Sequence, residues 1–221
     1  MGRTSDARER LVQAAIDLVW SSSYGDVGVD AICEAAGVKK GSFYHFFPTK
    51  DDLVVAALDA HFEARRPFLD AIFSPALPPL ERLRRYFDYP FERQEAVRER
   101  HGRVLGCFHN SLGTECIQRN PAVAAKVQEV LATYVRYIES AVRDAVAEGE
   151  LPREADPAAL AKAVFAYVQG TLAQARINDD LGSLRRIPGV AFALLGIAPP
   201  AGPARKKTPR GAQRGKPARI G

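Results

Sequence analysis

The sequence predicts an all-α protein that joins a small three-helix N-terminal unit, containing a helix-turn-helix, to a larger C-terminal helical domain. Three observations support this fold class. Apolar residues recur at helical spacing along most of the chain, no segment shows the two-residue alternation of a half-buried strand, and two short helices flank a glycine turn near the N-terminus. The 221 residues, 47% of them hydrophobic, suffice for one or two domains with a sizeable core.

The first expected helix covers residues 6–22 and follows a cap at Thr4 or Ser5. Its inner stripe is apolar and includes Leu11 and Ala15. This stripe gives the helix one face with which to pack against the two short helices that follow.

Those two short helices are expected between residues 29 and 47. Gly37 supplies the left-handed backbone geometry that ends the first of them. Phe43 and Phe47 stand four residues apart on a buried face of the second, and Pro48 stops it. The pair therefore forms a braced helical hairpin.

Cap and proline signals mark the next helices. Thr49 opens one helix, which continues to about residue 65, and Asp52 completes a capping box with Thr49. Pro79 suits the first turn of the following helix, in which Pro90 predicts a kink or a break.

Four further helices follow in the C-terminal half. Asx-Pro pairs open two of them, because the Asx side chain caps the helix and proline fits its first turn. The expected helices are residues 104–119, residues 121–148 after Asn120, a helix that begins at Pro157 after Asp156, and residues 183–195 with Pro188 early in the helix.

Basic and polar side chains gather on the second helix of the hairpin and just after it. DNA phosphates bind lysine, hydroxyl and tyrosine side chains, and a helix in this setting can enter a major groove. An ordinary hairpin with solvated lysines would show the same pattern. The candidate DNA contacts from residue type are Lys39, Lys40, Ser42, Tyr44 and Lys50.

The amino-acid sequence of this segment favours a DNA-binding helix over an ordinary hairpin. Residues 35–53, AAGVKKGSFYHFFPTKDDL, closely resemble the DNA-binding signature of the TetR family of repressors, which runs roughly AAGVSKGTLYHHFPSKEAL. The resemblance implies a homodimer in which each subunit joins an N-terminal three-helix DNA-binding domain to a C-terminal helical ligand-binding and dimerisation domain. It also implies that Lys40, Ser42, Tyr44 and Lys50 contact DNA and that His45 is a variable position that reaches bases.

On this resemblance the chain divides into a DNA-binding domain at residues 1–50, a regulatory and dimerisation domain at residues 51–198, and a tail at residues 199–221. Arg3 precedes the first helix, where an N-terminal arm would bring it to a phosphate or a minor groove. The last two long helices are expected to form the dimer interface as a four-helix bundle. The small side chains of residues 159–170 allow close packing there, although alanines also serve simply as good helix formers.

Three positions depart from the family pattern. Phe46 replaces a histidine that lies near a phosphate, so one backbone contact is in question. Val27 and Gly28 replace the threonine and serine that cap the first helix of the pair, and glycine offers no side-chain acceptor.

A ligand cavity is expected around residues 106–115, GCFHNSLGTE, which look like a Gly-Cys motif in one branch of TetR-like regulatory domains. Aromatic rings with a few polar groups would suit a small, mostly apolar or electrophilic effector. Plain core packing explains most of these aromatic residues equally well. The candidate ligand-binding residues are Tyr86, Phe87, Cys107, Asn110, Ser111, Thr114, Tyr134 and Phe165.

Three cysteines, an odd and sparse number, argue against a disulfide framework and suit a reducing compartment. Cys33 stands where the family usually has alanine, so we expect a buried small residue. Cys107 and Cys116 fall on roughly opposite faces of the expected helix and cannot easily form a disulfide. Cys107 is either a redox or electrophile sensor, if its thiolate is exposed and stabilised, or an inert buried thiol.

Positive charge is concentrated in the tail. The formal net charge of the chain is +5, but residues 199–221 contain seven basic residues and no acid, which leaves −2 for residues 1–198. The Pro, Gly and Arg content of the tail predicts disorder. The tail is either a second, sequence-independent phosphate contact or only a solubilising end. A nonspecific DNA-binding or architectural protein that uses this tail is the alternative to an operator-specific regulator.

Other classes of function lack support in the sequence. The four histidines are scattered, and no catalytic, metal-binding or phosphate-binding motif is present, so we expect no enzyme, metal or cofactor. No apolar run reaches the ~18 residues of a membrane helix, and early charges argue against a secretory signal. We therefore expect a cytoplasmic, homodimeric, ligand-responsive repressor that a small-molecule effector releases from a palindromic double-stranded DNA operator.

Overall fold

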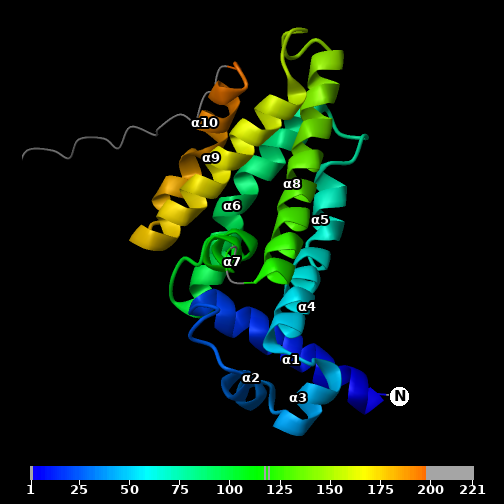
Figure 1. The fold of residues 1–221 in the computed structure, drawn as a ribbon. Coiled ribbons are helices and arrows are strands. Elements are labelled where there is room, and N and C mark those ends of the chain that lie inside the picture. Colours follow the sequence, from blue (N-terminus) through cyan, green and yellow to red (C-terminus); the bar gives the residue numbers. More distant parts are fainter. Residues whose placement is uncertain (1, 117, 119, 198–221) are drawn as a thin grey trace, which may run out of the picture.

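The computed structural model describes residues 2–116, 118 and 120–197, with the side chains of residues 2–5 left out. All regular structure in this part of the chain is helical, which confirms the predicted all-α class (Figure 1). The elements are α1 (Gly2–Ser21), α2 (Val29–Ala36), α3 (Lys40–Phe46), α4 (Lys50–Glu63), α5 (Arg66–Ile72), α6 (Pro79–His101), α7 (Phe108–Cys116), α8 (Pro121–Ala147), α9 (Pro157–Asn178), the 3₁₀ helix η1 (Gly182–Arg186) and α10 (Ile187–Leu194).

The N-terminal unit consists of α1, α2 and α3, joined to the start of α4. Helix α1 packs against α2, α3 and α4, and Figure 1 shows α2 and α3 on the side of α1 that faces away from the remaining helices. Leu11, Ile32, Phe43, Leu53 and Leu58 are completely buried at the centre of this unit. Their burial explains why the stripes of the first four helices face one another.

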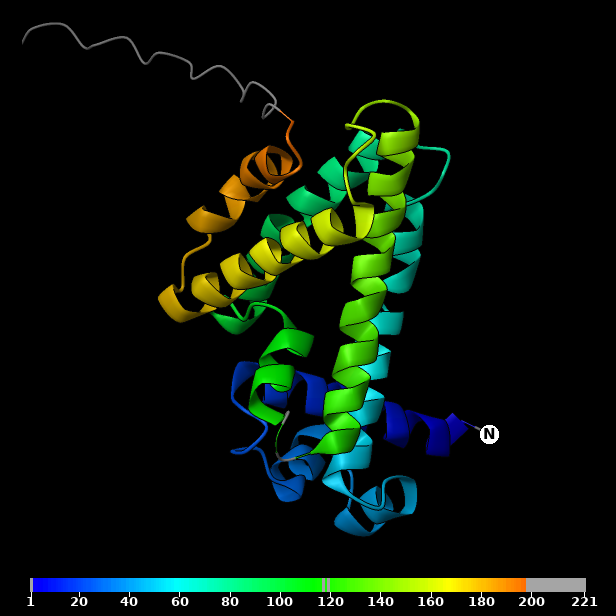
Figure 2. The same ribbon diagram turned by 45° about the horizontal axis from the view of Figure 1, so that its top comes forward.

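The C-terminal helices form a taller bundle. The long helix α8 packs on α4, α6, α7 and α9, and α10 packs on α9 and α6. Figure 2 shows α8 running beside α4 and α5 while α9 crosses it at an angle. Within the described residues, no helix is long and apolar enough to cross a membrane.

Several local predictions are confirmed. Gly37 has φ 62° at the end of α2, and Thr49 and Asp52 form the expected capping box at the start of α4. The side chains of Asn120 and Asp156 cap α8 and α9 by accepting hydrogen bonds from backbone N–H groups. These caps lie within a few residues of the signals that predicted them, so local chemistry alone determines them.

The start of the first helix was predicted wrongly. Helix α1 begins at Gly2, so Thr4 and Ser5 lie inside it and neither is its cap. Arg3 belongs to the first turn of α1 rather than to an arm ahead of the helix, and its side chain lies outside the described residues.

The break expected at Pro90 is absent, because α6 is continuous from Pro79 to His101. Proline removes one helical hydrogen bond, here to the Tyr86 carbonyl. Tyr86, Phe87 and Gln94 on either side of it are buried. This packing holds the two halves of α6 in one helix.

The helix expected over residues 104–119 begins four residues later, at Phe108. Gly106 has φ 66°, which does not belong to a right-handed helix. The Gln94 side chain holds this loop: its Oε1 accepts from the N–H groups of Leu105 at 3.0 Å and Gly106 at 2.9 Å, and its Nε2 donates to the Gly106 carbonyl at 2.9 Å. A tertiary contact thus replaces the first predicted turn of the helix.

Two further boundaries differ from the prediction. The helix expected to end near residue 65 ends at Glu63, and α5, which no local signal predicted, follows with Pro67 in its first turn. The last expected helix is divided into η1 and α10, and Pro188 lies in the first turn of α10. Both starts are consistent with proline, which is well tolerated in the first turn of a helix.

Candidate DNA-binding surface and regulatory cavity

The short helix α3 has one buried face and one exposed face. Phe43 and Phe47 are 0% and 3% exposed and pack into the N-terminal core, as predicted. Tyr44 is 51% exposed, which is unusual for so large a ring. The remaining predicted DNA contacts on and just before α3 are also exposed: Lys39, Lys40, Ser42 and His45.

Lys40 has an intramolecular partner on the neighbouring helix. Its Nζ lies 2.7 Å from Asp30 Oδ1, and this hydrogen bond is the main reason why the pKa of Lys40 is raised. Both side chains are largely exposed, so the ion pair contributes little to stability and a phosphate can compete for the lysine.

Lys50 occupies a different position from the other candidate contacts. Its Nζ donates to the carbonyl oxygens of Tyr24 at 2.8 Å and Val27 at 3.0 Å, and it lies 3.9 Å from the centre of the Tyr24 ring. Burial, aided by a hydrogen bond to Asp51, raises the pKa of Tyr24 to about 12. Lys50 therefore holds the loop between α1 and α2.

The structure shows where the three positions lie that depart from the TetR pattern, Val27, Gly28 and Phe46. Gly28 is the N-cap of α2 and makes no side-chain hydrogen bond. Val27 is buried in the core, and Phe46 is half-buried and packs against the same core. Neither Val27 nor Phe46 thus offers a polar group to a phosphate.

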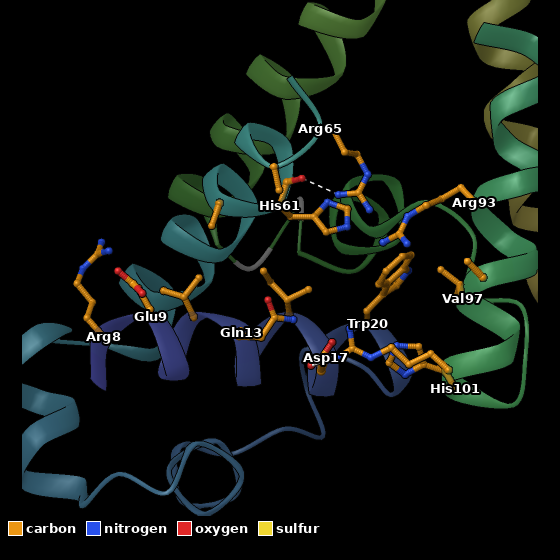
Figure 3. A pocket seen from close by; sticks show the side chains of 16 residues that line it. Arg8, Glu9, Gln13, Asp17, Trp20, His61, Arg65, Arg93, Val97 and His101 are labelled. Carbon is orange, nitrogen blue, oxygen red and sulfur yellow. Dashed lines mark hydrogen bonds and ion pairs between the residues drawn. The ribbon is translucent and has the colours of Figure 1, made fainter. Parts of the chain in front are cut away.

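Two adjoining hollows lie where the N-terminal unit meets the C-terminal helices. The aromatic cavity, of about 70 Å³, is lined mainly by α6, α7, α8 and α9. The cleft, of about 390 Å³, lies between α1, α4 and α6 (Figure 3). Four residues line both hollows: Trp20, His61, Arg65 and Arg93.

The structure brings only some of the predicted ligand-binding residues to the aromatic cavity. Tyr86, Cys107 and Tyr134 line it. Phe165 stacks on Tyr134 with 6.3 Å between ring centres, and Phe87 is buried against Phe192 in the core.

The other three predicted residues, Asn110, Ser111 and Thr114, line a separate surface groove together with Arg176. Arg176 donates to the Ser111 hydroxyl at 2.8 Å. None of these three residues lines the aromatic cavity.

Sequence reasoning missed the polar residues of the aromatic cavity. His109 Nε2 lies 3.1 Å from the Leu58 carbonyl, and burial lowers its pKa to about 4. His61 is 6% exposed, and burial is the main cause that lowers its pKa well below 6.5. Residues of the aromatic cavity that were not predicted to bind ligand include Trp20, His61, Arg65, Arg93, His109 and Gln169. No sequence spacing links them, because they come from five different parts of the chain.

The three cysteines carry free thiols. Cys33 is buried in the N-terminal core, as predicted. Burial raises the pKa of the Cys107 thiol, so little thiolate is present at neutral pH, which favours the inert reading over a sensor. Among the residues with described side chains, no three His, Cys, Asp or Glu residues are arranged to hold a metal ion.

Comparisons with known proteins agree with this architecture. Residues 11–57 match the model of bacterial regulatory proteins of the tetR family, and residues 79–188 match the tetracyclin repressor-like C-terminal domain. The chain is 35% identical over 190 residues to the transcriptional regulator AcuR of Cereibacter sphaeroides, which spans 84% of this chain and 85% of AcuR. It is 24% identical to the repressor DhaR of a Mycobacterium species, over 88% of this chain and 94% of DhaR.

Solved structures give the same result. The crystal structure of a TetR regulatory protein from Rhodobacter sphaeroides superposes with a TM-score of 0.75 at 32% identity, covering 85% of this chain and 98% of that protein. The reduced form of Escherichia coli NemR has a TM-score of 0.73 at 23% identity, over 89% of this chain and 99% of NemR. With both domains matched and a relative above 30% identity over most of its length, this chain belongs to the TetR family of transcriptional regulators.

Proposed function

We propose that this regulator is a homodimeric repressor that binds a palindromic operator and leaves it when a small-molecule effector enters the aromatic cavity. The observation that carries the proposal is the exposed face of α3, where Tyr44, Lys40 and Ser42 stand outward while Phe43 and Phe47 fix the helix from behind. A short helix mounted in this way is suited to a major groove. We also propose that the protein acts in the cytoplasm, where bacterial DNA lies.

Dimerisation is supported by an uncovered apolar face on α9 and α10. Ile177, Val190 and Leu194 are 72%, 40% and 44% exposed. The small side chains of α9 on this face, at positions 159, 163, 166 and 170, are exposed as well. A second subunit packed on this face through a two-fold axis would bury these side chains in a four-helix bundle. The interface then consists of α9 and α10 rather than of the last two long helices.

The effector would act on DNA binding through α1 and α4. Trp20 of α1 lines the aromatic cavity, and its Nε1 donates to the Leu105 carbonyl at 3.1 Å. A ligand that displaces Trp20 therefore moves a helix of the DNA-binding unit. Such a ligand shifts the population towards a released state only if it binds that state more tightly.

Gel-shift titrations of genomic fragments test the DNA-binding surface. We expect Tyr44→Ala and Lys40→Ala each to weaken operator binding about 10-fold or more, since each removes a contact in both subunits. Arg153→Ala, an exposed basic residue between α8 and α9, is the matched control and should leave affinity unchanged. Wild-type affinity in both α3 variants would remove this helix from the interface.

The nonspecific alternative rests on the basic tail, which lies outside the described residues. A protein that used only the tail would shift all fragments alike and lose binding when residues 199–221 are deleted.

Light scattering coupled to gel filtration tests the dimer: wild type should elute as a dimer and Ile177→Asp as a monomer.

A further inference from the structure

Two arginines meet where the aromatic cavity joins the cleft. Arg65 follows α4 and Arg93 lies on α6, and Figure 3 shows their guanidinium groups reaching towards each other beside Trp20 and His61. Arg65 Nη1 donates to the His61 carbonyl at 2.6 Å. The Arg93 guanidinium lies 5.5 Å from the centre of the Trp20 ring.

Among the described side chains neither arginine of this pair forms an ion pair. The residues that line the aromatic cavity include no Asp or Glu, and the acids that line the cleft are Glu9 and Asp17. Other arginines nearby are paired: Arg66 with Glu63 at 2.6 Å and Arg100 with Asp17 at 2.7 Å. Burial and then the positive charge of Arg65 lower the pKa of Arg93. An anion placed between the two guanidinium groups would offset their mutual repulsion and would favour the charged form of Arg93.

Unpartnered polar atoms line the same cavity. Both ring nitrogens of His61 and Oε1 of Gln169 are buried and have no hydrogen-bond partner among the described residues. Folded proteins satisfy nearly all buried polar atoms, so a cavity that collects several of them is suited to a polar ligand group. The His61 ring is neutral at pH 7 and can donate one hydrogen bond to an anion.

The rest of the lining is aromatic and narrow. Trp20, Tyr86, Phe108 and Tyr134 contribute rings, and the aromatic cavity holds only about 70 Å³. A ligand that fits must therefore be small and must carry an apolar body next to its polar group.

We propose that this cavity binds a small organic monocarboxylate, with its carboxylate between Arg65 and Arg93 and its apolar body against Trp20, Tyr86 and Tyr134. The inference rests on the proposed function, because it assigns a chemical class to the effector of the same cavity. Guanidinium groups bind carboxylates and phosphates in the same forked geometry. The narrow aromatic lining selects the planar, less strongly hydrated carboxylate. Cations are excluded by the two like charges.

The single tryptophan of the chain, Trp20, reports binding directly because it lies in the cavity. The test titrates the full-length protein with acetate, butanoate, hexanoate and benzoate, each beside its primary amide, and follows tryptophan fluorescence. We expect a saturable change with at least one carboxylate, at an affinity at least about 10-fold above that of its amide. Equal affinities for acid and amide, no response to all four acids, or tighter binding of phenyl phosphate than of benzoate would overturn the proposal.

Charge-removing variants locate the anion. Arg65→Gln and Arg93→Gln should each weaken carboxylate binding about 10- to 100-fold while amide binding stays unchanged. Arg66→Gln and Arg100→Gln remove the same charge beside Arg65 and inside the cleft, and should change affinity less than about 3-fold because both arginines already have a carboxylate partner. Equal losses of affinity in all four variants would indicate a general electrostatic attraction. Such a result would contradict a specific carboxylate site between Arg65 and Arg93.

Folding and function are separable in this test. Arg93→Gln removes an uncompensated charge, so we expect its melting temperature to be at least that of wild type, and Arg93→Lys supplies a second variant that keeps the charge without the fork. A protein that binds its operator and ignores carboxylates overturns only the ligand class. A protein that binds carboxylates but no operator overturns the proposed repressor.

Discussion

The imidazole of His61 illustrates how a ligand cavity lowers the stability of the fold. Its ring centre lies 5.2 Å from that of Trp20, 4.7 Å from that of Phe108 and 5.0 Å from that of His109. Packing is therefore dense, yet both ring nitrogens lack partners among the described residues. Such groups lose hydration on folding without recovering a hydrogen bond.

Replacement of this ring by an apolar side chain of similar volume should stabilise the fold. We expect His61→Leu to raise the free energy of unfolding by about 1–2 kcal/mol, because it removes two unsatisfied buried nitrogens. Urea denaturation measures the change. The control, His101→Leu, alters a partly exposed ring and should stay within about 0.5 kcal/mol. A less stable His61→Leu protein would mean that the nitrogens are satisfied in solution.

The buried histidines also predict acid sensitivity. The pKa of His109 is lowered from 6.5 to about 4, and that of His61 is lowered as well. Between pH 6.5 and pH 4 these histidines therefore bind protons in the unfolded chain but not in the folded chain. Their contribution to the free energy of unfolding is fully present above pH 6.5 and is lost as the pH falls towards 4. His109 alone should make the free energy of unfolding roughly 2 kcal/mol lower at pH 5 than at pH 7.5.

Urea denaturation at these two pH values checks this expectation. His109→Gln keeps a donor for the Leu58 carbonyl but does not titrate, so its stability should depend less on pH. The same pH dependence in the variant and in wild type would show that other groups cause the loss.

At the scale of elements, the loop between α6 and α7 depends on Gly106. Its φ is 66°, and a Cβ at this position would lie 3.0 Å from the Leu172 carbonyl oxygen of α9. The glycine thus satisfies two demands at once, a left-handed backbone and a close helix approach. Gln94 holds the same loop by three hydrogen bonds.

Gly106→Ala separates these demands when it is compared with Gly149→Ala. Gly149 also has a positive φ of 79°, but a Cβ there would meet nothing within 4 Å. We expect a loss of about 2–4 kcal/mol in the free energy of unfolding for Gly106→Ala and of about 1–2 kcal/mol for Gly149→Ala. Thermal and urea unfolding give both values. Equal losses would show that the carbonyl of Leu172 moves away at no cost.

The sequence predicts the helix caps better than the helix boundaries. The caps at Thr49, Asn120 and Asp156 are local, and each was predicted at the correct position. Tertiary contacts decide the other two features. Packing keeps α6 continuous through Pro90, and the hydrogen bonds of Gln94 delay the start of α7. A local sequence pattern contains no information on such contacts.

The candidate site divides in the same way. The exposed face of α3 follows from the period of one helix, so Tyr44 and Phe43 fell on the predicted sides. The arginine pair could not be predicted, because Arg65 and Arg93 come from separate elements and meet Trp20 of a third only in the folded chain. The candidate cysteine, Cys107, does line the cavity, but its raised pKa leaves little of the reactive thiolate.

At the scale of the whole molecule, several contacts connect the DNA-binding unit with the regulatory helices. Glu115 of α7 accepts hydrogen bonds from the N–H groups of Tyr24 at 2.9 Å and Gly25 at 2.7 Å. Arg176 of α9 donates to the Ser22 carbonyl at 3.2 Å, and Arg100 pairs with Asp17. Trp20 lines both the aromatic cavity and the cleft. A ligand in either hollow would therefore act on the contacts that join the two units.

We expect two subunits to present α3 to successive major grooves of one symmetric site. DNase I footprinting on genomic fragments that the purified protein selects tests this most directly. We expect one protected inverted repeat whose half-sites are centred about 10 base pairs apart, or a multiple of that, on one face of the duplex. Protection without an inverted repeat, or equal protection of every fragment, would contradict it.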